Sequence, residues 1–402
     1  MKSQSSSPSN HASSFSSSVH VHFPDQERNN ELLFTLSGVN VTIANAIRRT
    51  ILADINTVVF NTKEYKDPKL NHCQIYENTT RLNNELIKQR LSCIPIHITD
   101  VKEFDINQHY LQIREENTDD TVFYVTTEHF QIINKERKEP ISKEMRDKIF
   151  PSSRHLEHEW YIDFVRLRPR IGDAPTERLF LTCNFSIGNA KEDGMYNVVS
   201  TCAYKYTVDK EKQQRELETL KELWANEGKT HEQIEFEEKN WKLLEGVRVP
   251  YTKPNSFDFI IESVGVFEPE NLVIKACNII NRKLDSLIQQ EDIFIRSLEK
   301  QTTIENCFEI VLKNDDYTIG KIIEYMMYSL FYEGENNLLS FCGFKKLHPH
   351  DPDSYIQIAF KNNVTESSMS SVIRSKIQDC AIGAIEIFCK IKEEFKSRSG
   401  RK

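Results

Sequence analysis

The sequence lacks three features that would settle its class at once: a long apolar run, a secretory leader and an excess of positive charge. No stretch of 18 apolar residues occurs among its 402 residues, so we expect no membrane-spanning helix. Its beginning shows neither a basic start nor an apolar core, and we expect no secretory signal there. The net charge of −8 argues against a protein whose whole surface binds nucleic acid, because phosphate binding needs clustered lysine and arginine.

Closely spaced cysteines are missing as well. The nine cysteines are odd in number, and the two closest, Cys380 and Cys389, are nine positions apart. A disulfide framework would be even in number and dense, and a zinc ribbon would show a C-x-x-C motif. We therefore predict reduced cysteines that act as small buried hydrophobes in a reducing compartment, with no metal and no cofactor.

The length predicts more than one structural unit. Ten of the first 18 residues are serine, so this tail has too little apolar surface to offset its chain entropy. The predicted organisation is a disordered tail (1–30), a split module (31–60 and 250–288), a β-rich insertion domain (61–208), a charged helical insertion (209–249), a linker (289–302), a second module (303–396) and a basic tail (397–402).

Two segments of the first module show clear periodicity. Residues 32–36 alternate as a strand, and a helix is expected from about Thr42 to Asp54, capped by Asn40 or Thr42. Residues 257–261 alternate again, and Pro269 suits the first turn of the next helix. That helix carries one apolar stripe, made of Leu272, Val273, Ala276, Cys277, Ile280, Leu284 and Leu287.

The second module repeats this order of elements. A strand at 308–312 leads to Asp315 and Asp316, which are expected to cap a helix with an apolar stripe from Ile319 to Leu330. A strand at 355–361 precedes a long helix from about Ser367 to Phe395, whose stripe runs from Met369 to Phe388. The unit of strand, capped helix, strand and long helix therefore occurs twice, without detectable residue identity between the copies.

The intervening sequence differs from both modules. Strands are expected at 58–61, 110–114, 122–126, 161–166, 179–184 and 203–207, with a short helix at 83–90. Residues 209–245 hold 11 acidic and 7 basic residues, or half of the net charge of the chain. Leu217, Leu220 and Trp224 keep helical spacing there, so we predict a charged helical excursion on the outside.

At this point the motifs resemble a family. The core Asn45-Ala46-Ile47-Arg48-Arg49, followed by Asp54-Ile55-Asn56-Thr57, is similar to the signature of DNA-directed RNA polymerase assembly subunits: the bacterial alpha, archaeal D-type and third-largest eukaryotic subunits. Residues 81–98, 187–199 and 259–284 resemble further landmarks of these proteins. Residues 316–320 and 343–349 resemble their small partner, which is the archaeal L-type subunit or the eleventh subunit of eukaryotic polymerase II.

The resemblance implies an α+β fold in which two alpha-like dimerisation modules, each a sheet with two packed helices, pair within one chain. It implies a non-catalytic assembly platform that docks the largest and second-largest polymerase subunits and small adaptor subunits. DNA and RNA would be reached only through the complex, and neither a membrane nor a homo-oligomer is expected. Such a D-like and L-like fusion is similar to the arrangement in large cytoplasmic DNA viruses, so the expected location is virion and host cytoplasm if viral, or nucleus if cellular.

The resemblance also assigns residues. Asn45, Arg48 and Arg49 are predicted to lie at the docking surface for the large subunits, where the fixed donor fork of arginine suits carbonyls and carboxylates. Some relatives hold a metal with cysteines in the insertion domain, but residues 101–178 contain no cysteine, so no metal is carried over. The predicted intramolecular dimerisation residues are Ile43, Ile47, Ile51, Ala276, Ile280, Leu284, Ile319, Ile322, Ile323, Met326, Leu330, Ile377, Ala381 and Ile385.

Two other classes of function have weaker support. A stand-alone enzyme would need a site, and neither a glycine-rich phosphate loop nor a nucleophile elbow occurs. A stand-alone nucleic-acid-binding transcription factor is the alternative, supported by arginines at 166, 168 and 170 and by the basic end of the chain. The candidate metal or acid–base pairs are His20 with His22, Asp119 with Asp120, His155 with His158, and Asp315 with Asp316.

Overall fold

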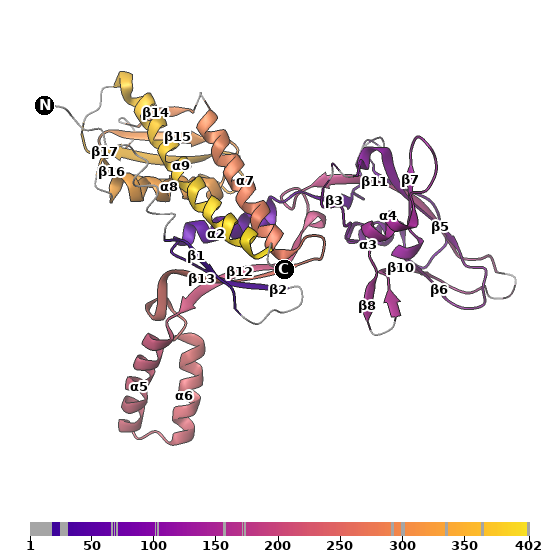
Figure 1. The fold of residues 1–402 in the computed structure, drawn as a ribbon, viewed down its shortest axis with the longest axis horizontal. Helices are drawn as coiled ribbons and strands as arrows, with labels where there is room; N and C mark the ends of the chain where they lie inside the picture. Colours follow the sequence, from indigo (N-terminus) through magenta and orange to yellow (C-terminus); the bar gives the residue numbers. More distant parts are fainter. Residues whose placement is uncertain are drawn as a thin grey trace. The chain divides into compact units, whose positions relative to one another are not determined.

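The computed structural model shows an α+β chain that forms two compact units (Figure 1). The first unit contains Met1–Ile51, Thr201–Glu262 and Pro269–Lys402, and the second contains Leu52–Ser200 and Ser263–Glu268. No helix in the part of the chain that the structure describes is long and apolar enough to cross a membrane. The described residues are 18–24, 31–65, 67, 69, 71–100, 102, 104–155, 158–170, 172, 174–290, 293–298, 302–333, 337–362 and 366–399.

A four-stranded antiparallel sheet is the base of the first module. Its strands lie in the order β1 (His20–His22), β2 (Glu31–Ser37), β13 (Thr252–Ser263) and β12 (Val199–Val208). Alternate residues of β2 are buried, as the sequence predicted, and Phe34 lies opposite Phe259 in the register. Their rings stack with centroids 4.8 Å apart. This apolar face of the sheet forms the core of the module.

Two helices bring their apolar stripes to this unit. Helix α2 (Val41–Ala53) begins where Asn40 accepts a hydrogen bond from the amide of Thr42 at 2.9 Å, which confirms the predicted cap. Helix α7 (Pro269–Gln289) starts at the predicted proline, and every residue of its predicted stripe is buried. A short 3₁₀ turn, η5 (Val249–Tyr251), leads into β13.

The second module has its own antiparallel sheet. The strand order is β14 (Ile295–Ser297), β15 (Cys307–Leu312), β17 (Ser354–Phe360) and β16 (Leu339–Lys345). Helix α8 (Tyr317–Met327) is capped by Asp316, as predicted, and passes into a π-turn, η6 (Tyr328–Tyr332). The wider turn shifts the helical phase, so Phe331 is buried and the predicted Leu330 is only half-buried. Helix α9 (Glu366–Ser399) follows β17.

Several segments differ from their sequence-based description. The expected linker at 289–302 contains β14, which pairs with β15, and the expected disordered tail contains β1, which pairs with β2. Residues 1–17 of that tail and residues 400–402 of the basic tail lie outside the described residues. Strand β12, expected in the insertion domain, lies instead in the sheet of the first module. In each case backbone pairing decides the location, and a sequence pattern cannot show which strand a segment joins.

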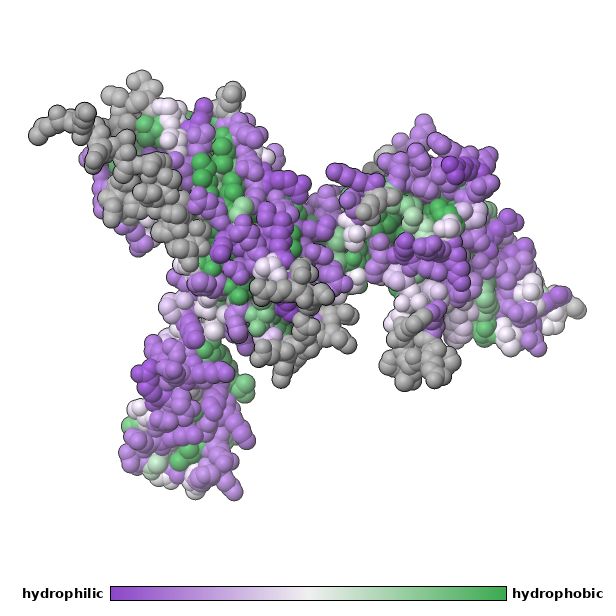
Figure 2. Space-filling view, viewed as in Figure 1, coloured by the Kyte–Doolittle hydropathy of each residue, from purple (hydrophilic) through white to green (hydrophobic). Residues whose placement is uncertain are grey.

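The charged insertion is helical, as its spacing predicted, and it forms a hairpin of two helices. Helix α5 (Lys210–Asn226) is capped by Asp209, and α6 (His231–Leu244) by Thr230. Leu217 is buried in the hairpin, and Lys221 forms an ion pair with Glu238 at 2.6 Å. The surface of the hairpin is mainly hydrophilic, with hydrophobic residues exposed among the charges (Figure 2).

The second unit is β-rich, as predicted for the insertion. Its main sheet has the order β3 (Thr57–Phe60), β11 (Arg178–Gly188), β5 (His109–Glu116) and β7 (Gln131–Asn134), with β4 (Cys73–Asn78) also paired to β11. Smaller pairs join β6 (Phe123–Thr126) to β10 (Asp163–Leu167) and β8 (Ser153–His155) to β9 (His158–Trp160). The helical elements are α3 (Asn84–Ser92), η2 (Ile106–Gln108), η3 (Thr127–His129), α4 (Lys143–Ile149) and η4 (Gly194–Tyr196). Arg90 on α3 donates to the carbonyl of Phe164 at 2.6 Å and so fastens this helix to β10.

Candidate subunit interface

Helices α7 and α9 pack against each other in the first unit and join the two modules. They run antiparallel, because Lys392 bonds Asn278 at 3.3 Å whereas Gln378, earlier in α9, bonds the carbonyl of Ile288 at 3.3 Å. The residues of this seam that are fully buried include Ala276, Ile280 and Leu284 on α7 and Ile377 and Ala381 on α9. At about 1.5–3 kcal/mol for each large apolar side chain, the seam supplies more stabilisation than any charged edge.

The C-terminal part of α9 extends the seam into the core of the first module. Phe395 is fully buried, and its ring makes edge-to-face contacts with Phe34, at 5.0 Å between centroids, and with Phe23, at 5.2 Å. The guanidinium of Arg398 lies 4.1 Å from the ring centroid of Phe23. A helix that begins in the second module therefore completes the hydrophobic core of the first.

Arg49 on α2 links the two modules through polar contacts. Its Nη2 donates to Asp316 Oδ2 at 2.9 Å, and its Nε donates to Thr318 Oγ1 at 3.0 Å. Asp316 also caps α8 through the amide of Thr318, at 2.8 Å. One guanidinium thus binds both side chains at the start of α8, and two motifs that lie far apart in the sequence meet here. Arg49, which was predicted to bind the large subunits, therefore binds residues of its own chain.

We expect Arg49→Ala to lower the free energy of unfolding of the first unit by about 1 kcal/mol. The ion pair is only partly shielded from water, so its Coulomb energy is screened, but the hydrogen bond to Thr318 is lost as well. The difference from wild type should shrink at high salt. Urea unfolding at low and high ionic strength measures both effects, and a salt-independent loss would contradict the ionic part.

Arg48 occupies a different position from its neighbour. Its Nε donates to Asn45 Oδ1 at 3.0 Å, one turn earlier on α2, and both side chains are half-buried. Arg48 also lies near β12: burial raises the pKa of the Cys202 thiol to about 12, and the positive charge of Arg48 partly offsets that rise. Among the described residues, no acceptor is found for the terminal Nη groups of Arg48. Asn45 therefore fixes the direction of the Arg48 guanidinium.

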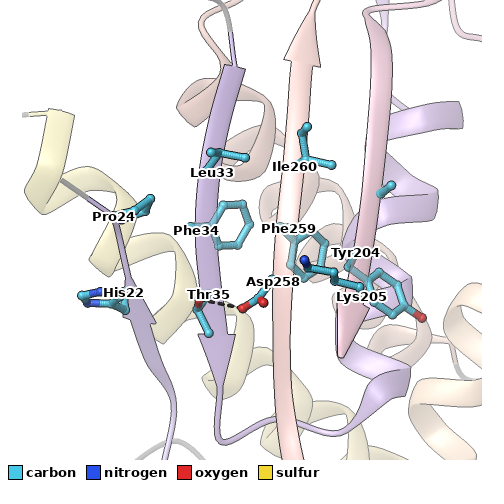
Figure 3. A pocket seen from close by; sticks show the side chains of 11 residues that line it. His22, Pro24, Leu33, Phe34, Thr35, Tyr204, Lys205, Asp258, Phe259 and Ile260 are labelled. Atoms are coloured by element: carbon cyan, nitrogen blue, oxygen red, sulfur yellow. Dashed lines mark hydrogen bonds between the residues drawn. The ribbon is translucent and has the colours of Figure 1, made fainter. Parts of the chain in front are cut away.

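The open face of the first sheet carries a groove of about 560 Å³. Leu33, Thr35, Asp258 and Ile260 lie along it on the central strands (Figure 3). Asp258 is held by the hydroxyl of Thr35 at 2.9 Å and by that of Thr207 at 2.8 Å. The remaining lining residues are His22, Pro24, Phe34, Ala203, Tyr204, Lys205 and Phe259. A mixed apolar and polar groove of this kind suits a polypeptide segment.

The predicted dimerisation residues are largely buried in the first unit. All are buried except Leu330 and Ile385, which are half-buried. Three further core residues of α9, which the predicted stripe did not include, are Ile387, Ile391 and Phe395. Their spacing of four residues was the available signal. The charged residues between them hid it.

The other candidate metal or acid–base pairs do not gather into a larger cluster within the described residues. Over the described ranges, no cluster of three or more His, Cys, Asp or Glu residues suits a metal ion. His155 and His158 face each other in the backbone register of the β8–β9 hairpin, while Asp119 lies in a turn. The arginines at 166, 168 and 170, which supported the nucleic-acid-binding alternative, do not share one strand, because β10 ends at Leu167 and Arg168 is paired with Glu177.

Comparisons with known proteins address this arrangement. The family described as the RNA polymerase Rpb3/Rpb11 dimerisation domain matches residues 33–284, a range that ends before the second module. DNA-directed RNA polymerase II subunit RPB3 of Schizosaccharomyces pombe is 23% identical over 268 residues, which is 65% of this chain and 84% of the relative. The polymerase subunit Rpo3 of Pyrococcus furiosus is 26% identical over 282 residues, or 66% and 94%. Human RPAC1, of polymerases I and III, is 22% identical over 315 residues, or 65% and 82%.

Proposed function

The chain belongs to the RNA polymerase Rpb3/Rpb11 dimerisation-domain family, and from this premise we propose that it is a non-catalytic assembly subunit of a multisubunit DNA-dependent RNA polymerase. Relatives named as RNA polymerase subunits in a fission yeast, an archaeon and human support this role. Transcription would then be the activity of the complex, and this chain would contribute the surface on which the complex forms.

We further propose that the chain supplies both halves of the dimer, as an intramolecular pseudo-heterodimer of a D-like and an L-like module. The antiparallel packing of α7 on α9 carries this proposal. The contact of Arg49 with the start of α8 adds a polar link between the same two modules. A tether raises the effective concentration of the second module to about the millimolar range, so pairing no longer depends on a separate subunit.

Cutting the segment that connects the two modules tests this proposal directly. A protease site inserted between Gln290 and Ile293 of the full chain should allow cleavage without separation, because the seam and Phe395 hold the two parts together. We expect one native size-exclusion peak that contains both fragments in equal amounts, and release of the fragments in urea. Dissociation on cleavage under native conditions would contradict intramolecular pairing. An uncleaved chain that elutes as a dimer would contradict it too.

The docking surface proposed for the two largest subunits centres on Arg48 and Asn45. Arg48 presents outer donors for which no acceptor is found in the described part of the chain, and Asn45 fixes its direction. The groove over β2 and β13 is a second proposed surface, suited to a segment of a small adaptor subunit. Arg49 is assigned a mainly internal role in this scheme.

The origin and location of the chain remain proposals as well. A fused pair of modules is consistent with a large cytoplasmic DNA virus, with the chain in the virion and host cytoplasm, whereas a cellular source would place it in the nucleus. Immunoblotting of purified virions and of nuclear fractions separates the two. The alternative function, a stand-alone nucleic-acid-binding factor, predicts tight and salt-sensitive DNA binding by the isolated chain.

A further inference from the structure

Cys73 and Cys183 lie directly opposite each other in the second unit. They are register partners on the antiparallel strands β4 and β11. The next pair along the ladder, His72 opposite Asn184, is hydrogen-bonded, because the amide of Asn184 donates to the carbonyl of His72 at 2.9 Å. Since hydrogen-bonded and non-hydrogen-bonded pairs alternate along an antiparallel ladder, the two cysteines form a non-hydrogen-bonded pair, whose side chains lie closest together.

This position fits the geometry of a disulfide. Non-hydrogen-bonded partners have Cα atoms about 4.5 Å apart, which falls within the range of about 4.4–6.8 Å that disulfides use. Both residues are free thiols in the structure, with Cys73 5% and Cys183 1% exposed. Bond formation would therefore need little movement of the backbone. Over the described residues β4 pairs only with β11, so it is an edge strand that a small oxidant reaches by local opening.

The surroundings of the two thiols also differ. A hydrogen bond from Cys183 lowers the pKa of Cys73, and the charge of Lys88 lowers it further against the effect of burial. Burial raises the pKa of Cys183, and the same hydrogen bond raises it more. Cys73 also lies on the edge strand and is the more exposed of the two, so we assign it the role of nucleophile and Cys183 that of its resolving partner.

We propose that Cys73 and Cys183 are an oxidation site that forms a reversible disulfide with a peroxide. The Cys73 thiolate attacks one peroxide oxygen, the O–O bond breaks, and the leaving hydroxide takes a proton to become water. Cys183 then loses its proton and attacks the Cys73 sulfenic sulfur, which releases hydroxide that this proton converts to water. Two thiols and one hydrogen peroxide thus give one disulfide and two waters, and the sulfurs lose the two electrons that the peroxide gains. The bond locks β4 to β11.

Peptide mapping of the full chain after hydrogen peroxide treatment tests the site. A Cys93→Ser background removes an exposed thiol that would otherwise link two chains. We expect a linked peptide pair that contains Cys73 and Cys183, loss of two alkylatable thiols, and recovery of both with dithiothreitol. The oxidised chain should unfold several degrees higher, since the bond closes a long loop.

Variants separate the two roles. Cys183→Ser should leave Cys73 trapped as sulfenic or sulfinic acid, whereas Cys73→Ser should leave Cys183 reduced. Cys277→Ser, which removes a fully buried thiol on α7, is the matched control and should not change the linked pair. The proposal is overturned if Cys73 of the Cys93→Ser chain remains alkylatable after peroxide, or if it links to another cysteine. The map of this chain alone decides the test, even where Cys73→Ser or Cys183→Ser fails to fold.

A second, independent inference concerns the outer face of helix α6. Phe236 is 64% exposed and Leu243 is 74% exposed, and their separation of seven positions places both on one face. Leu244, beside them, is also exposed. The other exposed residues of α6 are polar or charged, so these three large apolar side chains form an apolar stripe whose exposure to water is unfavourable.

The charge around this stripe determines which kind of partner could bind it. Lys221 and Lys242 both pair with Glu238, and Lys229 pairs with Glu237, so these cations are neutralised within the hairpin. The 11 acidic residues of the segment 209–245 exceed its 7 basic ones, which leaves the hairpin with net negative charge. Nucleic acid, anionic lipid and a second acidic hairpin would all be repelled. We infer that the stripe docks an amphipathic helix of another protein that carries lysine or arginine beside large apolar side chains.

A labelled peptide of leucine and lysine, helical and amphipathic, is the probe for this surface. Fluorescence anisotropy with the full chain should show binding that weakens at high salt, and a leucine–glutamate peptide of the same pattern should not bind. Phe236→Ser with Leu243→Ser should weaken binding at least about tenfold, whereas Ile162→Ser, at an exposed position of the second unit, should not. Equal binding of the two peptides, or an unaffected double variant, would overturn the inference.

Discussion

Phe395→Ala is expected to lower the free energy of unfolding of the first unit by about 3–5 kcal/mol. The ring is fully buried and contacts Phe34 and Phe23, so its removal loses apolar burial and leaves a cavity in a close-packed core. Because α9 begins in the second module, the same change also weakens the seam between the modules. Urea unfolding of the full chain, followed by near-ultraviolet signals, measures the loss.

Ile382→Ala is the matched control on the same helix. Ile382 is 48% exposed, so its truncation should change stability by no more than about 0.5 kcal/mol. In the chain cleaved between the modules, Phe395→Ala should also increase release of the second fragment. Equal stabilities of the two variants would show that the end of α9 does not pack into the core of the first module in solution.

The helices of each module could be predicted from sequence because their apolar stripes keep one face throughout. Every predicted stripe residue of α7 is buried, and α2 begins at the predicted cap. The prediction for α8 was wrong at its end, because a π-turn changes the phase of the helix and buries Phe331 in place of Leu330. Local periodicity assumes a constant helical repeat, and a π-turn breaks that assumption.

Sequence periodicity could not predict the contacts between the two modules. Arg49 and Asp316 are 267 positions apart, and neither motif indicates the other as its partner. The end of α9 shows the same limit. Ile391 and Phe395 are buried although their neighbours are charged, as is typical of a solvated helix, and the ring of Phe395 contacts Phe34 of the module that precedes it in the chain. The docking role of Arg48 rests on a family resemblance, and it stays a prediction.

Arg48→Glu is expected to reduce recovery of the two largest polymerase subunits with the tagged chain at least about tenfold. The terminal donors of Arg48 find no acceptor among the described residues, while Asn45 holds the guanidinium in direction through a 3.0 Å hydrogen bond. Charge reversal replaces those donors with a carboxylate that repels the same acceptors. Arg48→Lys should have an intermediate effect, because lysine keeps the charge but lacks the planar fork.

Arg282→Glu is the control that distinguishes a loss of docking from a loss of folding. It makes the same charge change as Arg48→Glu, at an exposed position of α7. This control should recover the large subunits normally. Arg49→Ala provides the opposite comparison, because it should lower stability through the lost contact with Asp316 while Arg48 still supports docking. If Arg48→Glu co-purifies with the large subunits as well as Arg282→Glu does, the docking role of Arg48 is wrong. If Arg49→Ala abolishes recovery at unchanged stability, the docking cation is Arg49, and its contact with Asp316 gives way when the large subunits bind.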